Sequence, residues 1–242
     1  MLLKTQAIYG YKLAATDGEI GHIRDFYFDD KTWVVRYLVA DTGGWLSGRL
    51  VLISPHAFGA FDRDEKTLAV KLTRKRIEES PSIETHRPVS RQYEVDYYRY
   101  YGWPAYWEGA GMWGLGSFPV VTPPSGDELA ALGPHHHRAD KHLQSALSVQ
   151  GYHIQASDGA IGHVTGFMVD DKSWKIRELV VETGHWYAGK EILISPAKVS
   201  EVSYEQSKVV VHLTMADIRR TEENRVAKAA SQRAPAGGFP TE

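Results

Sequence analysis

The chain has 242 residues, of which 43% are hydrophobic and 24% charged, and its formal net charge is −2. This balance is that of an ordinary globular protein, and it lacks the basic excess expected of a nucleic-acid-binding surface. The sequence contains no cysteine, which excludes disulfides, thiolate catalysis and cysteine-based zinc sites. The N-terminal residues lack the apolar core of a signal peptide, and no apolar stretch is long enough to cross a bilayer. We therefore expect a cytoplasmic protein.

Residues 10–77 and residues 151–218 are two copies of one module. Aligned with a constant offset of 141 and without a gap, they are identical at 28 of 68 positions. A gapless match of this length predicts two copies of one fold. A residue kept in both copies serves the module, whereas a residue found in one copy only is a candidate for a role specific to this protein.

The first copy reads as a series of short strands separated by turns. The strands that we expect are Tyr11–Ala14, Ile20–Phe28, Trp33–Ala40, Trp45–Ile53, Phe58–Phe61 and Leu68–Leu72. The Asp-Gly pair at residues 17–18 predicts a tight hairpin turn, and Thr73 predicts the N-cap of a short helix that carries Ile77. Five or six strands with glycine-bearing turns, closed by a helical turn, indicate a small β-barrel. The second copy predicts the same elements.

Four pairs of repeated residues receive structural assignments. The pairs are Gly21 and Gly162, Trp33 and Trp174, Trp45 and Trp186, and Pro55 and Pro196. A glycine within a strand predicts a bulge or a bend, and a proline ends a strand because it cannot donate to the ladder. Repeated tryptophans are most simply explained by packing in the core or at the barrel rim, with a binding platform as the alternative.

Two sets of repeated polar residues could have a functional role instead of a structural one. His22 and His163, each near an acidic residue such as Asp29, could form a proton relay, although a partly exposed side chain beside a turn is the simpler explanation. The acidic pairs at residues 29–30 and 170–171 could bind a cation, but they lack the spaced oxygen ligands that calcium requires. We expect turn chemistry there.

No nucleophile has a neighbouring base at suitable spacing, so we expect no enzymatic activity.

The segment between the copies, residues 80–147, is unusually aromatic. Residues 93–107 contain six tyrosines and two tryptophans, and Trp113 follows in a glycine-rich stretch. One interpretation is an ordered strap that packs its aromatic rings against the barrels. The other is a docking surface for a partner protein, because exposed tyrosine and tryptophan are typical hot-spot residues. The candidate partner-binding residues are Trp103, Tyr106, Trp107, Trp113, Tyr100 and Tyr101.

The same segment contains a cluster of histidines that could bind a metal weakly. The weak candidates are His135, His136, His137 and His142. Consecutive histidines on a loop rarely build a closed tetrahedral site, and no carboxylate that could orient them is apparent. We therefore predict no metal and no cofactor.

Several motifs occur in both copies and together resemble the PRC-barrel family. They are Gly-x-Ile-Gly-His-[Ile/Val], Phe-x-x-Asp, Trp-x-[Ile/Val]-Arg-x-Leu-Val followed by Thr-Gly, Leu-Ile-Ser-Pro, and Val-x-Leu-Thr-x-x-x-Ile. The family includes the cytoplasmic domain of the photosynthetic reaction-centre H subunit and the C-terminal domain of a ribosome maturation factor. The resemblance implies a domain that docks on partner proteins. This chain lacks the membrane helix of the former and the N-terminal barrel of the latter.

These observations predict an all-β protein of two PRC-type barrels in tandem, each closed by a short helix. The expected parts are a first barrel over residues 1–79, a connector over 80–147, a second barrel with a C-terminal helix over 148–228, and a disordered tail over 229–242. We expect the two barrels to pack as a pseudo-twofold pair, or the chain to self-associate. The expected function is a non-catalytic interaction or assembly module. The alternatives are a small-ligand or metal-binding sensor between the barrels and the connector, and a ribosome- or RNA-associated factor.

Overall fold

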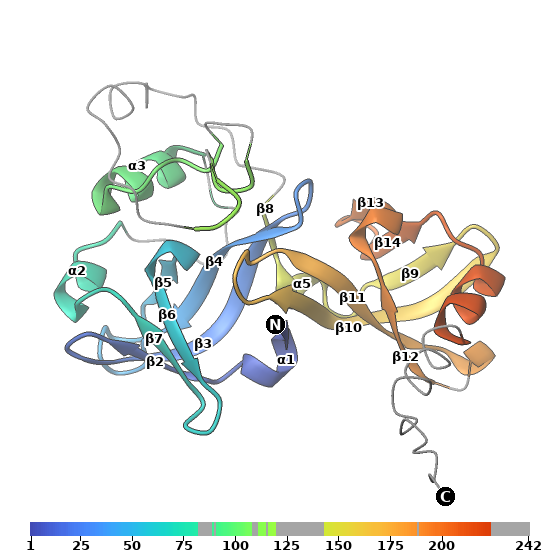
Figure 1. Ribbon diagram of the computed structural model, residues 1–242, viewed down its shortest axis with the longest axis horizontal. Coiled ribbons are helices and arrows are strands. Elements are labelled where there is room, and N and C mark those ends of the chain that lie inside the picture. Colours follow the sequence, from blue (N-terminus) through green and yellow to red (C-terminus); the bar gives the residue numbers. More distant parts are fainter. Residues whose placement is uncertain are drawn as a thin grey trace, which may run out of the picture.

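The computed structural model describes residues 1–81, 89, 91–107, 111–114, 116–119, 143–187 and 189–223. Two β-modules lie side by side and repeat the same order of strands (Figure 1). Barrel 1 is built from β2 (Lys12–Ala15), β3 (Gly18–Asp29), β4 (Val34–Asp41), β5 (Leu50–Ile53), β6 (Phe58–Asp62) and β7 (Thr67–Val70). Barrel 2 is built from β9 (His153–Ala156), β10 (Gly159–Asp170), β11 (Ile176–Thr183), β12 (Glu191–Ile194), β13 (Val199–Ser203) and β14 (Lys208–Val211). The predicted all-β tandem repeat is therefore confirmed.

The two sheets have the same topology and the same register. Their strand orders are β5-β4-β3-β2-β7-β6 and β12-β11-β10-β9-β14-β13, and only β2–β7 and β9–β14 pair in parallel. His22 pairs with Asp41 in barrel 1, and His163 pairs with Glu182 in barrel 2, which preserves the offset of 141. The two copies therefore agree residue by residue in backbone pairing as well as in sequence.

Closure of each barrel differs from the sequence-based expectation. The hydrogen-bonded order of barrel 1 ends at β5 and β6, which are joined by the short 3₁₀ turn η1 (Pro55–Ala57) and by no ladder among the described residues.

The strand predicted over residues 45–53 begins only at Leu50. Residues 43–48 instead form a turn in which Gly43, Ser47 and Gly48 have positive φ. Glycine adopts that backbone conformation without strain, so this run favours a turn over a strand.

The repeated residues have the structural roles that the repeat suggested. A Cβ at Gly21 would lie 1.9 Å from the carbonyl oxygen of Asp41, and one at Gly162 would lie equally close to that of Glu182. Neighbouring strands can approach so closely only where no side chain intervenes. Pro55 and Pro196 each begin a 3₁₀ turn after a serine cap, η1 and η3 (Pro196–Lys198).

The predicted helix after each barrel is also present. Thr73 caps α2 (Arg74–Glu78) by accepting a hydrogen bond from the backbone N–H of Arg76. In barrel 2 the helical run covers residues 215–223, and Thr214 accepts a hydrogen bond from the backbone N–H of Asp217. The hydroxyl of a cap satisfies a donor that the first turn of a helix leaves free, so the two threonines serve the same purpose in both copies.

The segments that precede the two copies are exchanged between the barrels. β1 (Leu2–Lys4), which precedes barrel 1, pairs with β10 of barrel 2, and β8 (Leu143–Ser145), which precedes barrel 2, pairs with β3 of barrel 1. Each strand leads into one helical turn, α1 (Thr5–Ile8) or α5 (Ala146–Val149), and both turns lie at the centre of the molecule (Figure 1). The sequence repeat gave no sign of this exchange. Each barrel is therefore completed by the short strand that precedes the other copy of the repeat.

Asp25 fixes the exchanged segment on barrel 1. Its buried carboxylate accepts hydrogen bonds from the Ser145 hydroxyl at 2.5 Å and from the backbone N–H of Leu147 at 3.0 Å. Burial raises the pKa of Asp25, and the hydrogen bond from Ser145 opposes that rise. In barrel 2 the equivalent position is Gly166, and the side chain of Gln6 occupies the space where a Cβ would project. The two exchanges are therefore equivalent in backbone but use different side chains.

The barrels meet through a pair of reciprocal hydrogen bonds around the repeated tryptophans. The backbone N–H of Val35 donates to the carbonyl oxygen of Trp174, and that of Ile176 donates to the carbonyl oxygen of Trp33. Both tryptophans have positive φ, 57° and 58°, and both side chains are buried. Identical contacts in both directions establish a pseudo-twofold relation between the barrels, and the buried residues of both form one continuous core. Both tryptophans therefore belong to the core that the two barrels share.

Candidate functional site

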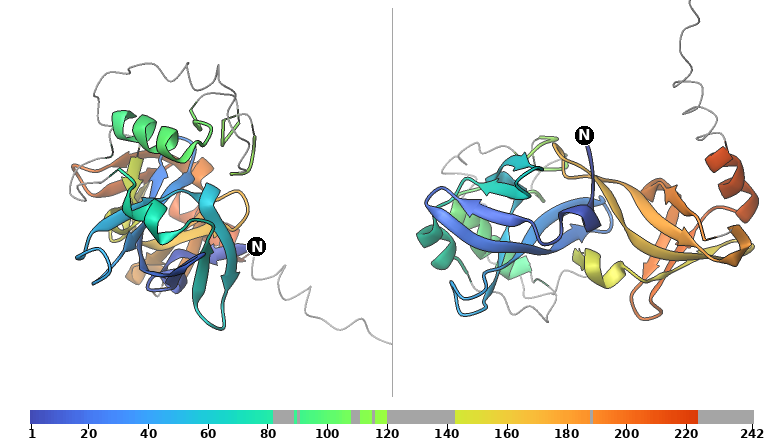
Figure 2. Two further views of the ribbon diagram at one scale, coloured as in Figure 1. Left: turned by 90° about the vertical axis from the view of Figure 1, so that its left-hand side faces the viewer. Right: turned by 90° about the horizontal axis from the view of Figure 1, so that it is seen from below.

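One face of barrel 1 is covered by the aromatic connector. We call α3 (Arg91–Tyr101) together with residues 102–107 and 111–114 the aromatic strap. Figure 2 shows α3 on one side of the barrel 1 strands. The strap lies over the face formed by β4, β5 and η1, which we call the strap face. The structure therefore contains the ordered strap that the aromatic composition suggested.

The middle of α3 is held on the strap face by Tyr97. Its side chain is fully buried, and its hydroxyl accepts a hydrogen bond from the backbone N–H of Ser54 at 3.0 Å while donating to the carbonyl oxygen of Leu52. These are backbone groups at the end of β5, where the sheet provides no further partner. Burial raises the pKa of Tyr97 well above its ordinary value. The phenol thus completes the hydrogen bonding of the strand end.

A buried carboxylate joins the strap to β4. Glu94 Oε1 accepts hydrogen bonds from the hydroxyls of Tyr37 and Tyr106, each at 2.8 Å, and the Glu94 side chain is fully buried. Burial, followed by the proximity of Glu94, raises the pKa of Tyr37. The Tyr37 phenol therefore stays protonated as a donor. A buried carboxylate is tolerated only with such partners, so this network specifies one position of the strap on the barrel.

Arg36 of β4 lies beneath the strap and binds it through several contacts. The Arg36 side chain is 2% exposed, and its guanidinium lies 3.8 Å from the ring centre of Tyr106 and 5.0 Å from that of Trp113. It donates hydrogen bonds to the carbonyl oxygen of Met112 and to the Thr32 hydroxyl. A guanidinium is suited to this position because its planar face stacks on rings while its edge donates hydrogen bonds.

His56 of η1 is the centre of an aromatic cluster. Its ring stacks on Trp103 with centroids 5.4 Å apart, and it meets the edges of Trp113 and Tyr98 at 5.1 and 5.9 Å. Burial, together with the nearby Arg36 charge, lowers the pKa of His56 to about 4. The imidazole is therefore neutral at physiological pH. It acts as a flat packing surface within the strap face.

Trp113 connects the strap to barrel 2. Its side chain is 2% exposed, and its indole N–H donates to the carbonyl oxygen of Ser173 at 2.9 Å. Ser173 belongs to the turn between β10 and β11, immediately before Trp174. The strap thus binds the turn that barrel 2 contributes to the pseudo-twofold interface. The Trp113 side chain thus combines ring packing with a hydrogen bond across the boundary between the two barrels.

The six predicted partner-binding residues lie mostly inside the protein. The side chains of Trp103, Tyr106, Trp113 and Tyr101 are buried, with 2–4% exposure, while Tyr100 and Trp107 are partly buried. The Tyr100 hydroxyl donates to the carbonyl oxygen of Arg76. Buried rings cannot form a docking surface without moving, so this corrects the placement of the docking surface on these side chains. The strap behaves as an internal ligand of barrel 1.

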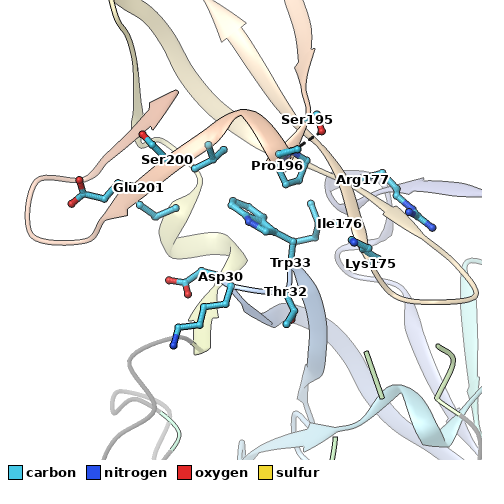
Figure 3. Close-up of a pocket in the computed structure, with 14 residues that line it drawn as sticks. Asp30, Thr32, Trp33, Lys175, Ile176, Arg177, Ser195, Pro196, Ser200 and Glu201 are labelled. Carbon is cyan, nitrogen blue, oxygen red and sulfur yellow. Dashed lines mark hydrogen bonds between the residues drawn. The ribbon is translucent and has the colours of Figure 1, made fainter. Parts of the chain in front are cut away.

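In the part of the chain that the structure describes, the equivalent face of barrel 2 is exposed. Thr32, Arg177, Ser195 and Ala197 are exposed there, whereas Arg36, Ser54 and His56 on barrel 1 are buried. A cavity of about 750 Å³ lies between the barrels on this face. Figure 3 shows the Trp33 indole among Ile176, Pro196 and the residues of β13. The residues that line the cavity are Asp30, Lys31, Thr32, Trp33, Lys175, Ile176, Arg177, Ser195, Pro196, Ala197, Val199, Ser200, Glu201 and Val202.

The cavity results from substitutions between the two copies. In barrel 1, Trp174 packs against Phe58 and Phe61 with ring centroids 4.6 and 6.0 Å apart. The corresponding residues of barrel 2 are valines 199 and 202, and Ala197 stands where barrel 1 has His56. Smaller side chains leave the space around Trp33 unfilled. The gapless alignment already contained these differences, but only the structure brings them to one place.

The polar groups of the cavity are mixed in charge. Lys31, Lys175 and Arg177 contribute cations, and Asp30 and Glu201 contribute carboxylates. The Tyr204 hydroxyl donates to Asp30 at 2.7 Å, and Arg177 lies 3.9 Å from Asp170. Burial, followed by the hydrogen bond to Asp30, raises the pKa of Tyr204. The rim of the cavity is therefore polar with an excess of cations, and its floor is apolar.

The remaining predicted sites can be located as follows. His135, His136, His137 and His142 lie outside the described residues, and the described part of the chain contains no cluster of three or more potential metal ligands. Trp45 is partly buried beneath the guanidinium of Arg74, at 4.7 Å, and the side chain of Trp186 is outside the described set.

The acidic pairs serve as turns. Asp29 Oδ1 accepts hydrogen bonds from the backbone N–H groups of Lys31 and Thr32, and Asp170 Oδ1 accepts the equivalent pair from Lys172 and Ser173. This confirms the turn chemistry predicted for both pairs. His163 lies 3.8 Å from Glu182, and both side chains are about half exposed. Such a surface pair provides no enclosed path for a proton.

The comparison with protein families agrees with the fold. Residues 6–78 and 148–217 each match the PRC-barrel domain, which together is more than half of the chain. The chain therefore belongs to the PRC-barrel family, as a tandem repeat of the domain. No curated protein matches it. None of the helices in the described part of the chain has the length and apolar character that a membrane span requires.

Proposed function

We propose that this protein is a non-catalytic interaction and assembly module that binds a partner protein through the open face of barrel 2. The observation that carries the proposal is the difference between two equivalent faces. On barrel 1 the protein's own aromatic strap covers the face, and on barrel 2 the same face is open with a cavity of about 750 Å³. A surface that binds a protein segment in one copy of a repeat is suited to bind one in the other.

The pattern of exposure supports this position. Arg36 is 2% exposed beneath the strap, whereas the Arg177 side chain, its equivalent, is 47% exposed. Arginine is enriched at protein interfaces, where its guanidinium combines stacking with hydrogen bonds. The cavity also has the apolar floor and polar rim that a small docking site needs. Barrel 2 therefore retains the cation that holds the strap on barrel 1, without the strap.

The absence of cysteine makes a direct test possible. A single-cysteine variant, Ser200→Cys, places a thiol at the cavity rim, and Glu65→Cys places one on an exposed turn of barrel 1. Each is labelled with a photoreactive benzophenone maleimide and irradiated in native cell extract. We expect a discrete cross-linked partner from the label at position 200 and none from position 65. Equal cross-linking from both positions would overturn the proposal.

A second candidate function follows from the size of the cavity. Small-molecule sites usually enclose roughly 300–1,000 Å³ with an apolar lining and a few polar groups, and the cavity around Trp33 falls in that range. A ligand that binds the native state raises the melting temperature by mass action. Thermal melting with a panel of metabolites therefore distinguishes a sensor from a docking module. A ligand that raises the melting temperature of the wild-type chain only, and not of a variant with a filled cavity, would favour the sensor.

A further inference from the structure

We propose that the cavity of barrel 2 recognises a tryptophan in the partner protein, followed or preceded by a hydrogen-bond acceptor for Arg177. This inference rests on the proposed docking function and names the chemistry of the partner segment. It is derived from the way in which the strap binds barrel 1. There, Arg36 contacts Trp113 and donates to the carbonyl oxygen of Met112, a turn carbonyl oxygen accepts the indole N–H, and His56 packs against the indole ring.

Two of the groups that contact Trp113 on barrel 1 have counterparts in the cavity. The indole N–H of Trp113 donates to the carbonyl oxygen of Ser173, and the equivalent residue, Thr32, lines the cavity. Arg36 has its counterpart in Arg177, and Trp33, which is equivalent to Trp174, also lines the cavity. The turn residue that provides the acceptor and the arginine that provides the cation are therefore repeated, and Trp33 adds an aromatic surface. The ring that these groups bind on barrel 1, Trp113, has no equivalent among the described residues of barrel 2.

The differences between the two sites make the second one roomier. Ala197 replaces His56, and valines 199 and 202 replace Phe58 and Phe61. Three aromatic rings that fill barrel 1 are thus missing from the walls of the cavity. An indole is the largest natural side chain, and it carries an N–H that requires an acceptor when buried. The space and the exposed Thr32 turn therefore fit tryptophan better than a smaller apolar side chain.

Charge indicates what should accompany the indole. Lys31, Lys175 and Arg177 surround the opening, while Asp30 already accepts a hydrogen bond from Tyr204. On barrel 1 the strap offers carbonyl oxygen to Arg36 and places the Glu94 carboxylate nearby through Tyr106. A partner segment that carries a carboxylate or a free carbonyl beside its tryptophan would satisfy the cations in the same way. The occupant is therefore an aromatic, acceptor-rich peptide segment.

We expect the tryptophan to come from another protein. Within the side chains that the structure describes, every tryptophan is buried or partly buried, and Trp113 is already bound to barrel 1. Release of the strap by a second copy would expose the aromatic cluster around His56. A partner with an accessible tryptophan binds without that cost.

The probe is a fluorescein-labelled peptide with the sequence of residues 111–119, and its control has alanine in place of the tryptophan. Binding to the full chain is measured by fluorescence anisotropy. We expect one peptide per chain, and because a hot-spot tryptophan dominates such contacts, the alanine peptide should bind about thirtyfold more weakly. Equal binding of the two peptides would overturn the proposal.

The position of the peptide is tested by filling the cavity. The double variant Val199→Phe/Val202→Phe restores the phenylalanines of barrel 1, and Leu147→Phe adds a ring at an exposed position as the control. We expect the double variant to abolish binding and the control to leave it unchanged. Retained binding by the double variant would mean that the peptide exchanges with the strap on barrel 1, which contradicts the proposal.

Arg177→Met tests the acceptor requirement separately. It keeps an apolar stem of similar length and removes the cation, so binding should weaken about tenfold, as the loss of a charge-assisted hydrogen bond implies. Unchanged binding would overturn that part of the proposal. If the peptide fails while a partner is still cross-linked from position 200, the docking function stands and the tryptophan inference falls. Self-association that the double variant abolishes would instead identify a second copy as the occupant.

Discussion

The two barrels share a backbone but differ in what covers the same face. On barrel 1, Ser54 and His56 are fully buried under the aromatic strap, while on barrel 2 the equivalent Ser195 and Ala197 are exposed. The side chains have changed accordingly, since Tyr37 is replaced by Glu178 in barrel 2. A tyrosine there reaches a buried carboxylate, whereas a glutamate tolerates water. The two faces are equivalent in backbone, but only the face of barrel 1 is part of the protein's own core.

The largest predicted effect concerns the residues that both barrels share. Gly21→Ala and Gly162→Ala would each place a Cβ 1.9 Å from a backbone carbonyl oxygen of the neighbouring strand. Because the strands must separate, we expect each substitution to cost more than about 4 kcal/mol in free energy of unfolding, measured by urea denaturation. Gly44→Ala, which has open space around it, is the control. A small loss of stability for only one of the two substitutions would show that the two backbones are not equivalent at this position.

The next largest predicted effect is a loss of stability that is specific to barrel 1. Trp113→Ala removes a buried indole and its hydrogen bond to Ser173. Deletion of a buried aromatic side chain typically costs about 3–5 kcal/mol. We expect a loss of that size in thermal or urea unfolding. Phe118→Ala, at a position that is 50% exposed, should change stability little. Equal effects of the two substitutions would mean that the strap does not stabilise barrel 1.

The pH dependence of stability should also come from barrel 1. His56 has a pKa lowered to about 4 by burial and by Arg36, against 6.5 for an unperturbed histidine. Between these values the unfolded chain binds more protons than the folded chain, so stability falls as pH falls through this window and is unaffected by His56 above it. The loss is at most roughly 3 kcal/mol.

The measurement for this prediction is urea denaturation between pH 4 and pH 7 of the wild type and of His56→Gln. We expect a smaller pH slope in the variant, because glutamine does not titrate. Buried Asp25, whose pKa is raised, contributes the opposite slope, but it is present in both proteins and cancels. Identical slopes in the two proteins would contradict the burial of a neutral His56.

The smallest predicted effect lies in barrel 2. Val199→Phe/Val202→Phe fills the cavity with the rings that barrel 1 has around Trp174. Cavity filling commonly adds about 0.5–2 kcal/mol to stability. We expect a small rise in melting temperature together with the loss of partner binding. A clear loss of stability would show that the face of barrel 2 cannot accept the packing of barrel 1.

The sequence predicted the parts of the fold that depend on local patterns. Turn residues, β-rich runs and the caps at Thr73 and Thr214 are read from neighbouring positions, and the offset of 141 extended each assignment to the second copy. The exchange of β1 and β8 was not predictable in this way. Residues 2–4 and 143–145 are short and carry no pattern that distinguishes one barrel from the other as a pairing partner. Tertiary contacts decide such a pairing.

The candidate site shows a similar limit. Aromatic composition identified residues 93–113 as special, but it could not distinguish rings exposed for docking from rings buried against Arg36 and His56. The decisive difference was present in the alignment as the change from phenylalanines 58 and 61 to valines 199 and 202. Its meaning required knowledge that both positions lie around a tryptophan from the other barrel. A substitution between the two repeats can be interpreted only when the residues that surround it in the structure are known.

The central claim is that equivalent faces are closed on barrel 1 and open to a partner on barrel 2. The chain has no cysteine, so the rates at which a thiol reagent labels Ser54→Cys and Ser195→Cys measure the two faces at matched positions. We predict rapid labelling at position 195 that slows when the partner or the tryptophan peptide is added, and strong protection at position 54 in all conditions. Equally rapid labelling at both positions, or no protection of position 195 by the bound segment, would contradict it.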